Sequence, residues 1–174
     1  CSGLVGSEMC IRDRVKSGLV DDPNVSQYRL TAHLGMAVFI YSLILWTVFD
    51  LSLNYNHAIR SRIKWMSSTL TLLIFLMILS GGLVAGTRAG IPFPTWPLMG
   101  DTFIPPQIYS MNPSWLSAFE DMATIQFNHR MFAYLLTIFI VIFAIVLLRS
   151  NVPRFLKNGT TALLFVLSLQ VALG

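Results

Sequence analysis

Long apolar runs, separated by short polar segments, dominate the pattern of this chain. Residues 30–49, 65–87 and 131–148 contain 20, 23 and 18 consecutive positions without Asp, Glu, Lys or Arg, and a fourth run covers 158–174. A bilayer core of about 30 Å requires ~20 apolar residues in a helix that rises about 1.5 Å per residue. The pattern therefore predicts an all-α fold, a polytopic transmembrane helix bundle with helices at about 30–49, 65–87, 127–148 and 158–174.

The composition agrees with a membrane protein and excludes several other classes. Of the 174 residues, 55% are hydrophobic and 11% are charged, whereas soluble domains carry roughly 25% charged residues. So little charge cannot cover a water-soluble surface, which excludes an ordinary soluble enzyme and a disordered chain. The two cysteines, Cys1 and Cys10, support neither a disulfide framework nor a CxxC metal site. The net charge is +4, and the basic residues lie between the apolar runs. We therefore expect membrane lipid as a partner and no nucleic acid.

The two ends of the chain differ from the apolar bundle. Residues 1–14 read CSGLVGSEMCIRDR and resemble translated sequencing-adaptor sequence, so we expect an artefact there and leave them out of the fold. Residues 15–29 form an outer-side segment, and the transmembrane region covers 30–174. Because the last run ends at Gly174 without a polar flank, we expect the helix at 158–174 to be truncated and the chain to be a fragment.

The basic residues predict how the helices are oriented, because Lys and Arg concentrate in cytoplasmic loops. Loops 50–64 and 149–157 each contain three basic residues, whereas the long segment 88–126 contains one basic and three acidic residues. The two basic loops should therefore face the cytoplasm or the mitochondrial matrix, and loop 88–126 should face the opposite, outer side. Lys16 and Arg29, in the tail on the predicted outer side, oppose this orientation slightly.

The outer loop 88–126 is rich in proline and aromatic residues between positions 91 and 115. Proline favours turns, and a disordered loop would be poor in aromatic residues. We therefore expect an ordered cap that lies on the bundle, with Trp96 and Trp115 near the lipid headgroups. The alternative is an interfacial aromatic belt without a binding role.

Two histidines lie at the edges of the predicted helices. His33 is near the start of the run 30–49, and His129 is near the start of the helix at 127–148. The predicted orientation places both near the outer surface at similar depth. Ionisable residues in membrane helices usually face the bundle interior, and neutral imidazole is a common ligand of haem iron. The alternative is a histidine that hydrogen-bonds a neighbouring helix or extends to the interface, while His57 in a loop is expected to be solvated.

Other polar and small residues near the outer surface allow two interpretations each. Arg130 could pair bidentately with a carboxylate such as a haem propionate, or it could extend to the interface. Gly82 and Gly86 form a GxxxG pair that permits the close approach of a helix or of a flat macrocycle. Glu120 and Asp121 precede a helix and are interpreted as capping residues, because negative charge is favoured at a helix N-terminus.

Five motifs form a combination that is more specific than any one of them. They are VKSGL at 15–19, VSQYRLTAHLG at 25–35, LSGGLVAGTRAG at 79–90, TWPLMG at 95–100 and QFNHRMFAYLL at 126–136. Together they resemble the haem A synthase family, in its mitochondrial and alphaproteobacterial branch. The resemblance implies a fragment of an eight-helix protein made of two pseudo-symmetric four-helix halves, with helices four to six and most of seven present. It also implies an oxidoreductase that converts the C8 methyl of haem O to a formyl, which gives haem A for cytochrome oxidase.

The resemblance assigns roles to individual residues. His33 matches the second histidine of the N-terminal half and would ligate the substrate haem, whereas His129 matches the first histidine of the C-terminal half and would ligate a cofactor haem b. Their partner histidines belong to helices two and eight, which this chain lacks. Gln126 stands where the other half of the family protein has an essential glutamate, and an amide cannot act as a carboxylate base. We therefore name no catalytic residue here, retain Arg130 as the candidate for propionate binding, and expect the fragment alone to be inactive.

The resemblance further implies partners and a location. The implied partners are the substrate haem O and an electron-transfer protein such as a ferredoxin, while haem O synthase and a homo-oligomer are left open. The membrane would be the mitochondrial inner membrane or the bacterial plasma membrane. Two alternatives come from other classes: a bis-histidine electron-transfer protein of the cytochrome b561 type, and a transport or structural bundle without haem.

Overall fold

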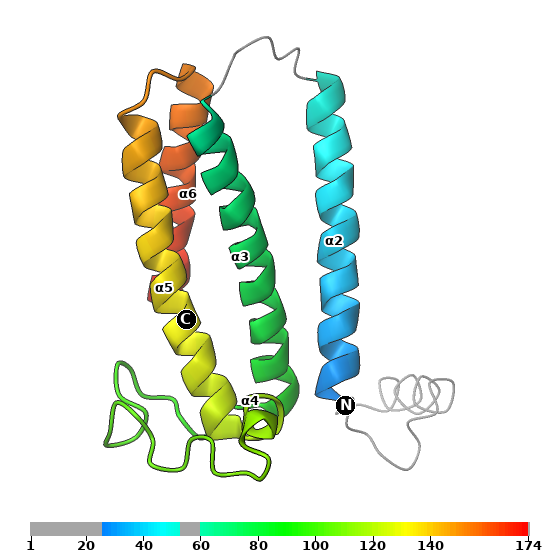
Figure 1. Ribbon diagram of the computed structural model, residues 1–174, viewed down its shortest axis with the longest axis vertical. Helices are drawn as coiled ribbons and strands as arrows, with labels where there is room; N and C mark the ends of the chain where they lie inside the picture. The colour runs from blue at the N-terminus through cyan, green and yellow to red at the C-terminus, as the bar shows by residue number, and fades with distance from the viewer. Residues whose placement is uncertain (1–25, 53–59, 174) are drawn as a thin grey trace, which may run out of the picture.

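Four long helices, each antiparallel to the one before it, make up most of the described chain (Figure 1). The computed structural model describes residues 26–52 and 60–173. The interpretations of residues 1–14, of 15–25 and of His57 therefore concern positions outside the described residues. The long helices are α2 (Gln27–Ser52), α3 (Ser61–Thr87), α5 (Met122–Leu148) and α6 (Arg154–Leu173), and the loop between α3 and α5 contains η1 (Ser114–Leu116) and α4 (Ser117–Glu120).

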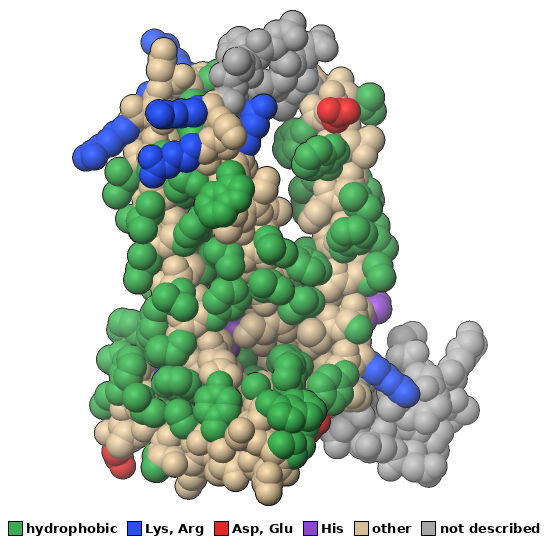
Figure 2. All heavy atoms as spheres, in the orientation of Figure 1, with side chains coloured by type: hydrophobic (Ala, Val, Ile, Leu, Met, Phe, Trp, Pro, Cys, Tyr) green, Lys and Arg blue, Asp and Glu red, His purple; other side chains and the backbone are tan. Residues whose placement is uncertain are grey.

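The long helices have the surface of a membrane protein. Each of the four is long and apolar enough to cross a bilayer, which confirms the predicted all-α transmembrane bundle. Large apolar side chains cover the visible sides of the helices (Figure 2). Most described Lys and Arg side chains gather at the end opposite the long loop (Figure 2), which agrees with the orientation predicted from the loop charges.

The helices begin several residues earlier than the apolar runs predicted. The start of α5 at Met122 rather than near residue 127 is explained by Asp121, whose carboxylate accepts a hydrogen bond from the backbone N–H of Thr124 at 2.9 Å. This N-cap confirms the capping interpretation of Asp121. A bilayer with its headgroup regions is about 40–45 Å thick, so membrane helices continue into polar flanks that a search for charge-free runs omits.

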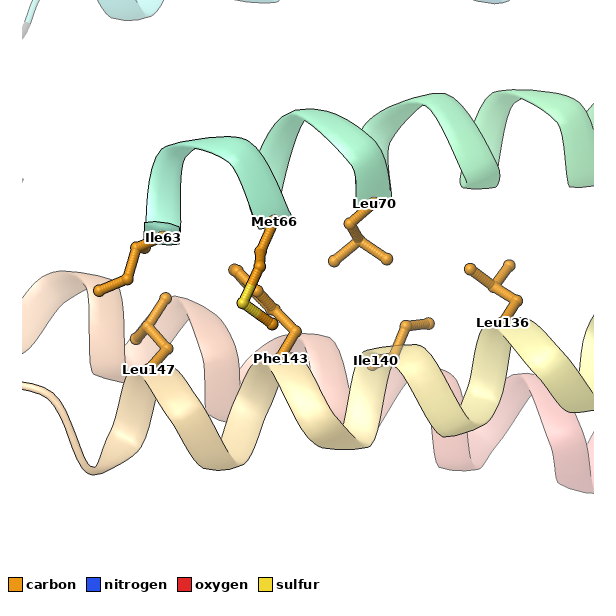
Figure 3. Packing of buried hydrophobic residues seen from close by; sticks show 7 residues of the cluster. All are labelled: Ile63, Met66, Leu70, Leu136, Ile140, Phe143 and Leu147. Carbon is orange, nitrogen blue, oxygen red and sulfur yellow. The ribbon is translucent and has the colours of Figure 1, made fainter. Parts of the chain in front are cut away.

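A cluster of buried apolar side chains joins α3 to α5 in the half of the bundle away from the long loop (Figure 3). Ile63 lies opposite Leu147, and Leu70 lies close to Ile140. These pairs, which are two helical turns apart on each helix, define the register of the antiparallel helices α3 and α5. Side chains of α6 pack against the same cluster. The cluster consists of Ile63, Met66, Leu70, Leu136, Ile140, Phe143 and Leu147.

Glycines of α3 bring it close to α2 near the long loop. A Cβ added at Gly82 would lie 3.0 Å from Oγ1 of Thr31, and one added at Gly86 would lie 2.7 Å from the backbone Cα of Gln27. The GxxxG pair is therefore used for helix–helix packing, and its neighbour is a helix rather than a macrocycle. The glycines fix how closely α2 and α3 approach each other.

We expect Gly86→Ala to destabilise the α2–α3 pair. The new Cβ meets backbone atoms, which cannot move aside as a side chain can, and overpacking typically costs about 1–3 kcal/mol. Gly159→Ala in α6 is the matched control, because nothing lies within 4 Å of a Cβ added there. Thermal unfolding of the detergent-solubilised protein should show a lower midpoint for Gly86→Ala only. An unchanged midpoint would contradict the tight packing of α2 on α3.

Candidate functional site

His129 lies near the start of α5 and its ring is directed at α3. The imidazole Nδ1 is 3.0 Å from the Oγ of Ser80, and a Cβ added at Gly81 would be 3.6 Å from the ring Cε1. The other ring nitrogen, Nε2, has no hydrogen-bond partner among the described residues. His129 is thus a half-buried imidazole with one nitrogen bonded to a neighbouring helix and one nitrogen free.

His33 lies on a different surface of the bundle. Thr31 and Gly35 of α2 contact α3, and a rotation of about 100° per residue places His33 on roughly the opposite side of the helix. Its side chain is exposed, which differs from the expectation that both histidines face the bundle interior. The reason is that α2 packs mainly against α3, so that its other faces stay uncovered within the described helices.

The two histidines nevertheless lie at similar depth. Both α2 and α5 begin at the end where the long loop lies (Figure 1). His33 follows the first residue of α2 by about 9 Å, and His129 follows the first residue of α5 by about 10 Å, from the rise of a helix. One imidazole points toward α3 and the other points away from it. This arrangement suits two separate ligand sites at the outer side of the membrane rather than one shared site.

Arg130 fastens the outer loop to α5. Its Nη2 donates to the carbonyl of Phe93 at 2.8 Å, and its Nη1 donates to the carbonyl of Leu98 at 3.1 Å. No carboxylate among the described residues pairs with this half-buried guanidinium. Three of the five N–H donors of an arginine remain beyond these two bonds, so the structure leaves both charge and donors available for an anionic group.

Further hydrogen bonds hold the loop on the first turns of α5. The indole N–H of Trp96 donates to the hydroxyl of Tyr134 at 3.0 Å. The backbone N–H of Tyr109 donates to Oγ1 of Thr124 at 3.0 Å, and the Tyr109 hydroxyl donates to Oδ1 of Asn128 at 3.1 Å. The residues from Phe93 to Tyr109 therefore form a cap, which hydrogen bonds hold on the first turns of α5. We call this segment the cap.

The tryptophans of the outer loop point outward from it. Trp96 is 71% exposed and Trp115 is 64% exposed, so neither contributes to a packed interior. Trp96 combines an exposed ring with a bonded N–H, which is the usual arrangement of a tryptophan at the level of the lipid headgroups. The exposed rings suit the interfacial belt, and the hydrogen bonds of the loop suit the ordered cap.

Glu120 has a role that differs from the predicted one. Instead of capping α5, its carboxylate accepts hydrogen bonds from the Tyr28 hydroxyl and from Nε2 of Gln27, the latter at 3.1 Å. Asp121, the next residue, already occupies the N-cap position. Glu120 therefore ties the end of α4 to the start of α2, and the capping interpretation is wrong for this residue.

Gln126 is a buried amide one turn before His129. The side chain is 9% exposed, and its Oε1 has no hydrogen-bond partner in the described structure. A buried acceptor without a donor costs free energy, so the arrangement suits a donor supplied from outside the described residues, such as a water molecule or a bound ligand.

These residues fit a haem better than a bare metal ion. Among the described residues, no three His, Cys, Asp or Glu side chains gather closely enough to hold an ion. A haem brings four ring nitrogens of its own and requires only axial ligands from the protein. His129 offers one axial nitrogen, Arg130 pairs with no described carboxylate and suits a propionate, and Gln126, whose Oε1 lacks a donor, lies one turn before His129 on α5.

Comparisons with known proteins point in one direction. Residues 3–174 match the COX15-CtaA family, which is described as cytochrome oxidase assembly protein. This match includes part of segment 1–14, whose origin stays a prediction. No solved structure matches the chain.

Several curated relatives are similar over most of the chain. A heme A synthase of Nitrosospira multiformis is 43% identical over 165 residues, which are 92% of this chain and 46% of the relative. A heme A synthase of Parvibaculum lavamentivorans is 44% identical over 73% of the chain and 37% of the relative. The heme A synthase of Paracoccus denitrificans is 40% identical over 92% of the chain and 44% of the relative. The chain thus spans somewhat less than half the length of these relatives.

Proposed function

Because this integral membrane chain belongs to the COX15-CtaA family of cytochrome oxidase assembly proteins, we propose that it provides the central helices of a haem A synthase. The activity would be the oxidation of the C8 methyl of haem O to a formyl, which yields haem A. Haem O synthase would supply the substrate, and an electron-transfer protein such as a ferredoxin would exchange the electrons of this oxidation. The position of two histidines at one depth but on opposite faces is the observation that supports two haem sites.

His129 is proposed as an axial ligand of a haem b cofactor. Its free Nε2 and the bonded Nδ1 are the arrangement found for ligating histidines, in which the second ring nitrogen is fixed by a hydrogen bond. When bound, a haem iron supplies one-electron redox chemistry. Arg130 would bind a propionate through the donors that the cap leaves free, and Gln126 would line the pocket with an uncharged acceptor.

His33 is proposed as a ligand of the substrate haem. Its imidazole is exposed on the face of α2 that packs on nothing among the described helices. An exposed imidazole in a membrane helix is unfavourable in lipid, so this face suits contact with helices that carry the rest of the substrate site. The described residues contain no carboxylate beside either histidine, and none is proposed as the catalytic base.

A chimera tests this function. The segment of the Nitrosospira multiformis relative that aligns with this chain is replaced by the chain, and haem A formed from haem O is measured by chromatography of extracted haems. We expect haem A from the chimera and none from residues 1–174 alone, because each proposed haem site is half built in the chain. Haem A from the isolated chain would show that its own helices contain the catalytic groups. A chimera that binds haem but forms no haem A would favour an electron-transfer protein.

A further inference from the structure

We infer that Ser80 is a positioning residue, which holds the His129 imidazole in the tautomer that can ligate iron. The inference rests on the proposed haem site at His129. The Oγ of Ser80 lies 3.0 Å from Nδ1, and an Nδ1–H that donates to this oxygen leaves Nε2 without a proton. Neutral imidazole ligates iron through the nitrogen that lacks the proton, so the bond selects Nε2 as the ligand atom and sets the plane of the ring.

The hydroxyl of Ser80 differs from the other hydroxyls of α3 that form hydrogen bonds. Oγ1 of Thr71 donates to the carbonyl of Ser67 at 3.0 Å, and Oγ1 of Thr87 donates to the carbonyl of Leu83 at 2.8 Å. Both bonds stay within the helix, four residues back, as is common for Ser and Thr in membrane helices. Ser80 instead hydrogen-bonds a side chain on another helix, and such a bond is not needed for the stability of α3 itself.

The surroundings of the ring make this hydrogen bond decisive for its orientation. Ser80 is the one described residue that hydrogen-bonds the imidazole, and the adjacent Gly81 offers no side chain that could hold the ring by contact. Away from water, an N–H without an acceptor is strongly unfavourable. A flip of the ring would break the bond and expose Nδ1–H to apolar surroundings, so the ring stays in the orientation that Ser80 sets.

The opposite direction of the Ser80–His129 hydrogen bond would give the other tautomer of the imidazole, and the two tautomers can be distinguished by experiment. If the Ser80 hydroxyl donates to Nδ1, the ring proton is on Nε2 and iron cannot bind there. The ¹⁵N chemical shifts of the His129 ring in the haem-free chimera separate these tautomers. We expect a protonated Nδ1 and an unprotonated Nε2. A proton on Nε2 in the haem-free protein would overturn the inference.

Substitutions in the holo-chimera complete the test. Ser80→Ala should weaken haem b binding by roughly 10- to 100-fold, as is typical for the loss of a hydrogen bond behind a metal-ligating histidine. It should also shift the haem b potential upward, because an imidazole without this acceptor donates less electron density to ferric iron. Ser80→Thr keeps the hydroxyl and should restore most of the affinity and the potential.

Two controls separate positioning from packing. Thr71→Ala removes an intrahelical hydrogen bond on the same helix and should change neither the affinity nor the potential. Gly81→Ala adds a methyl in ordinary contact with the ring and keeps the Ser80 bond, so the potential should stay unchanged. If Ser80→Ala leaves both the haem b affinity and the haem b potential unchanged, the inference about Ser80 is overturned while the proposed haem site is unaffected. A haem b that survives His129→Ala would contradict the haem site itself and the inference with it. If Ser80→Ala does not fold, Ser80→Thr and the ¹⁵N shifts decide.

Discussion

We expect His129→Ala in the chimera to remove the bound haem b while leaving the second haem site able to bind haem. His129 is the axial ligand proposed for haem b, and without it the iron keeps at most one protein ligand. His33→Ala should have the converse effect, with loss of substrate haem binding and retention of haem b. The physical reason is that the two imidazoles lie on different helix faces, one toward α3 and one away from it. Haem-to-protein ratios and reduced-minus-oxidised spectra of both variants measure these effects.

The same pair of variants can contradict the two-site arrangement. If His33→Ala and His129→Ala each abolish the same spectral component, both imidazoles ligate one iron and the face assignment of His33 does not hold in the complete protein. If neither substitution changes the haem content, the bundle does not bind haem through these residues. A variant of the exposed Ser42, whose hydroxyl donates only to the carbonyl of Val38, controls for general effects of substitution in α2.

The second large effect is expected for Arg130→Ala. In the chimera, this variant should weaken haem b binding by roughly 10- to 100-fold, since a hydrogen bond to a charged group contributes about 1.5–3 kcal/mol. It should also loosen the cap, because the bonds to the carbonyls of Phe93 and Leu98 are lost. Arg130→Lys should recover part of the affinity, since an ammonium keeps the charge but lacks the planar fork. Haem titration and proteolysis of the cap report the two effects separately.

Tyr134→Phe shows which of the two contacts of Arg130 matters for haem. This variant removes the acceptor of the Trp96 indole N–H and leaves the guanidinium in place, so it should loosen the cap without weakening haem binding. If Tyr134→Phe weakens haem b as strongly as Arg130→Ala does, the cap accounts for the effect and the propionate contact is refuted. Normal haem b affinity in Arg130→Ala would refute it as well.

The four long helices could be predicted from the sequence, because a bilayer requires helices to be apolar over the thickness of its core. Charge-free runs of membrane length predicted all four long helices, since an unpaired charge or backbone group is costly in lipid. The helix ends were less predictable. The start of α5 depends on the Asp121 cap. Polar residues such as Gln126 belong to this helix although they precede the apolar run from which it was predicted.

The site was predictable only in its depth and its residue types. His33 and His129 stand near the starts of their helices, so their common level followed from the chain alone. The role of Ser80 was not predictable from the sequence, because its contact with His129 depends on the register between α3 and α5. That register is set by the Ile63–Leu147 and Leu70–Ile140 pairs, and these pairs are recognisable only once the helices are placed. Arg130 and Glu120 contact loop and helix atoms that no periodicity indicates.

The contacts around His129 also bear on the order in which the protein is made. Ser80 of α3, the cap and the first turns of α5 belong to one helical hairpin, which contains the Ser80–His129 contact and the hydrogen bonds of Trp96 and Arg130. None of these contacts involves a residue of α6, and nascent chains fold from the N-terminal side. The hairpin can therefore close, with its histidine already oriented, while α6 is still being synthesised. The last described helix, α6, would then pack on a hairpin that has already formed.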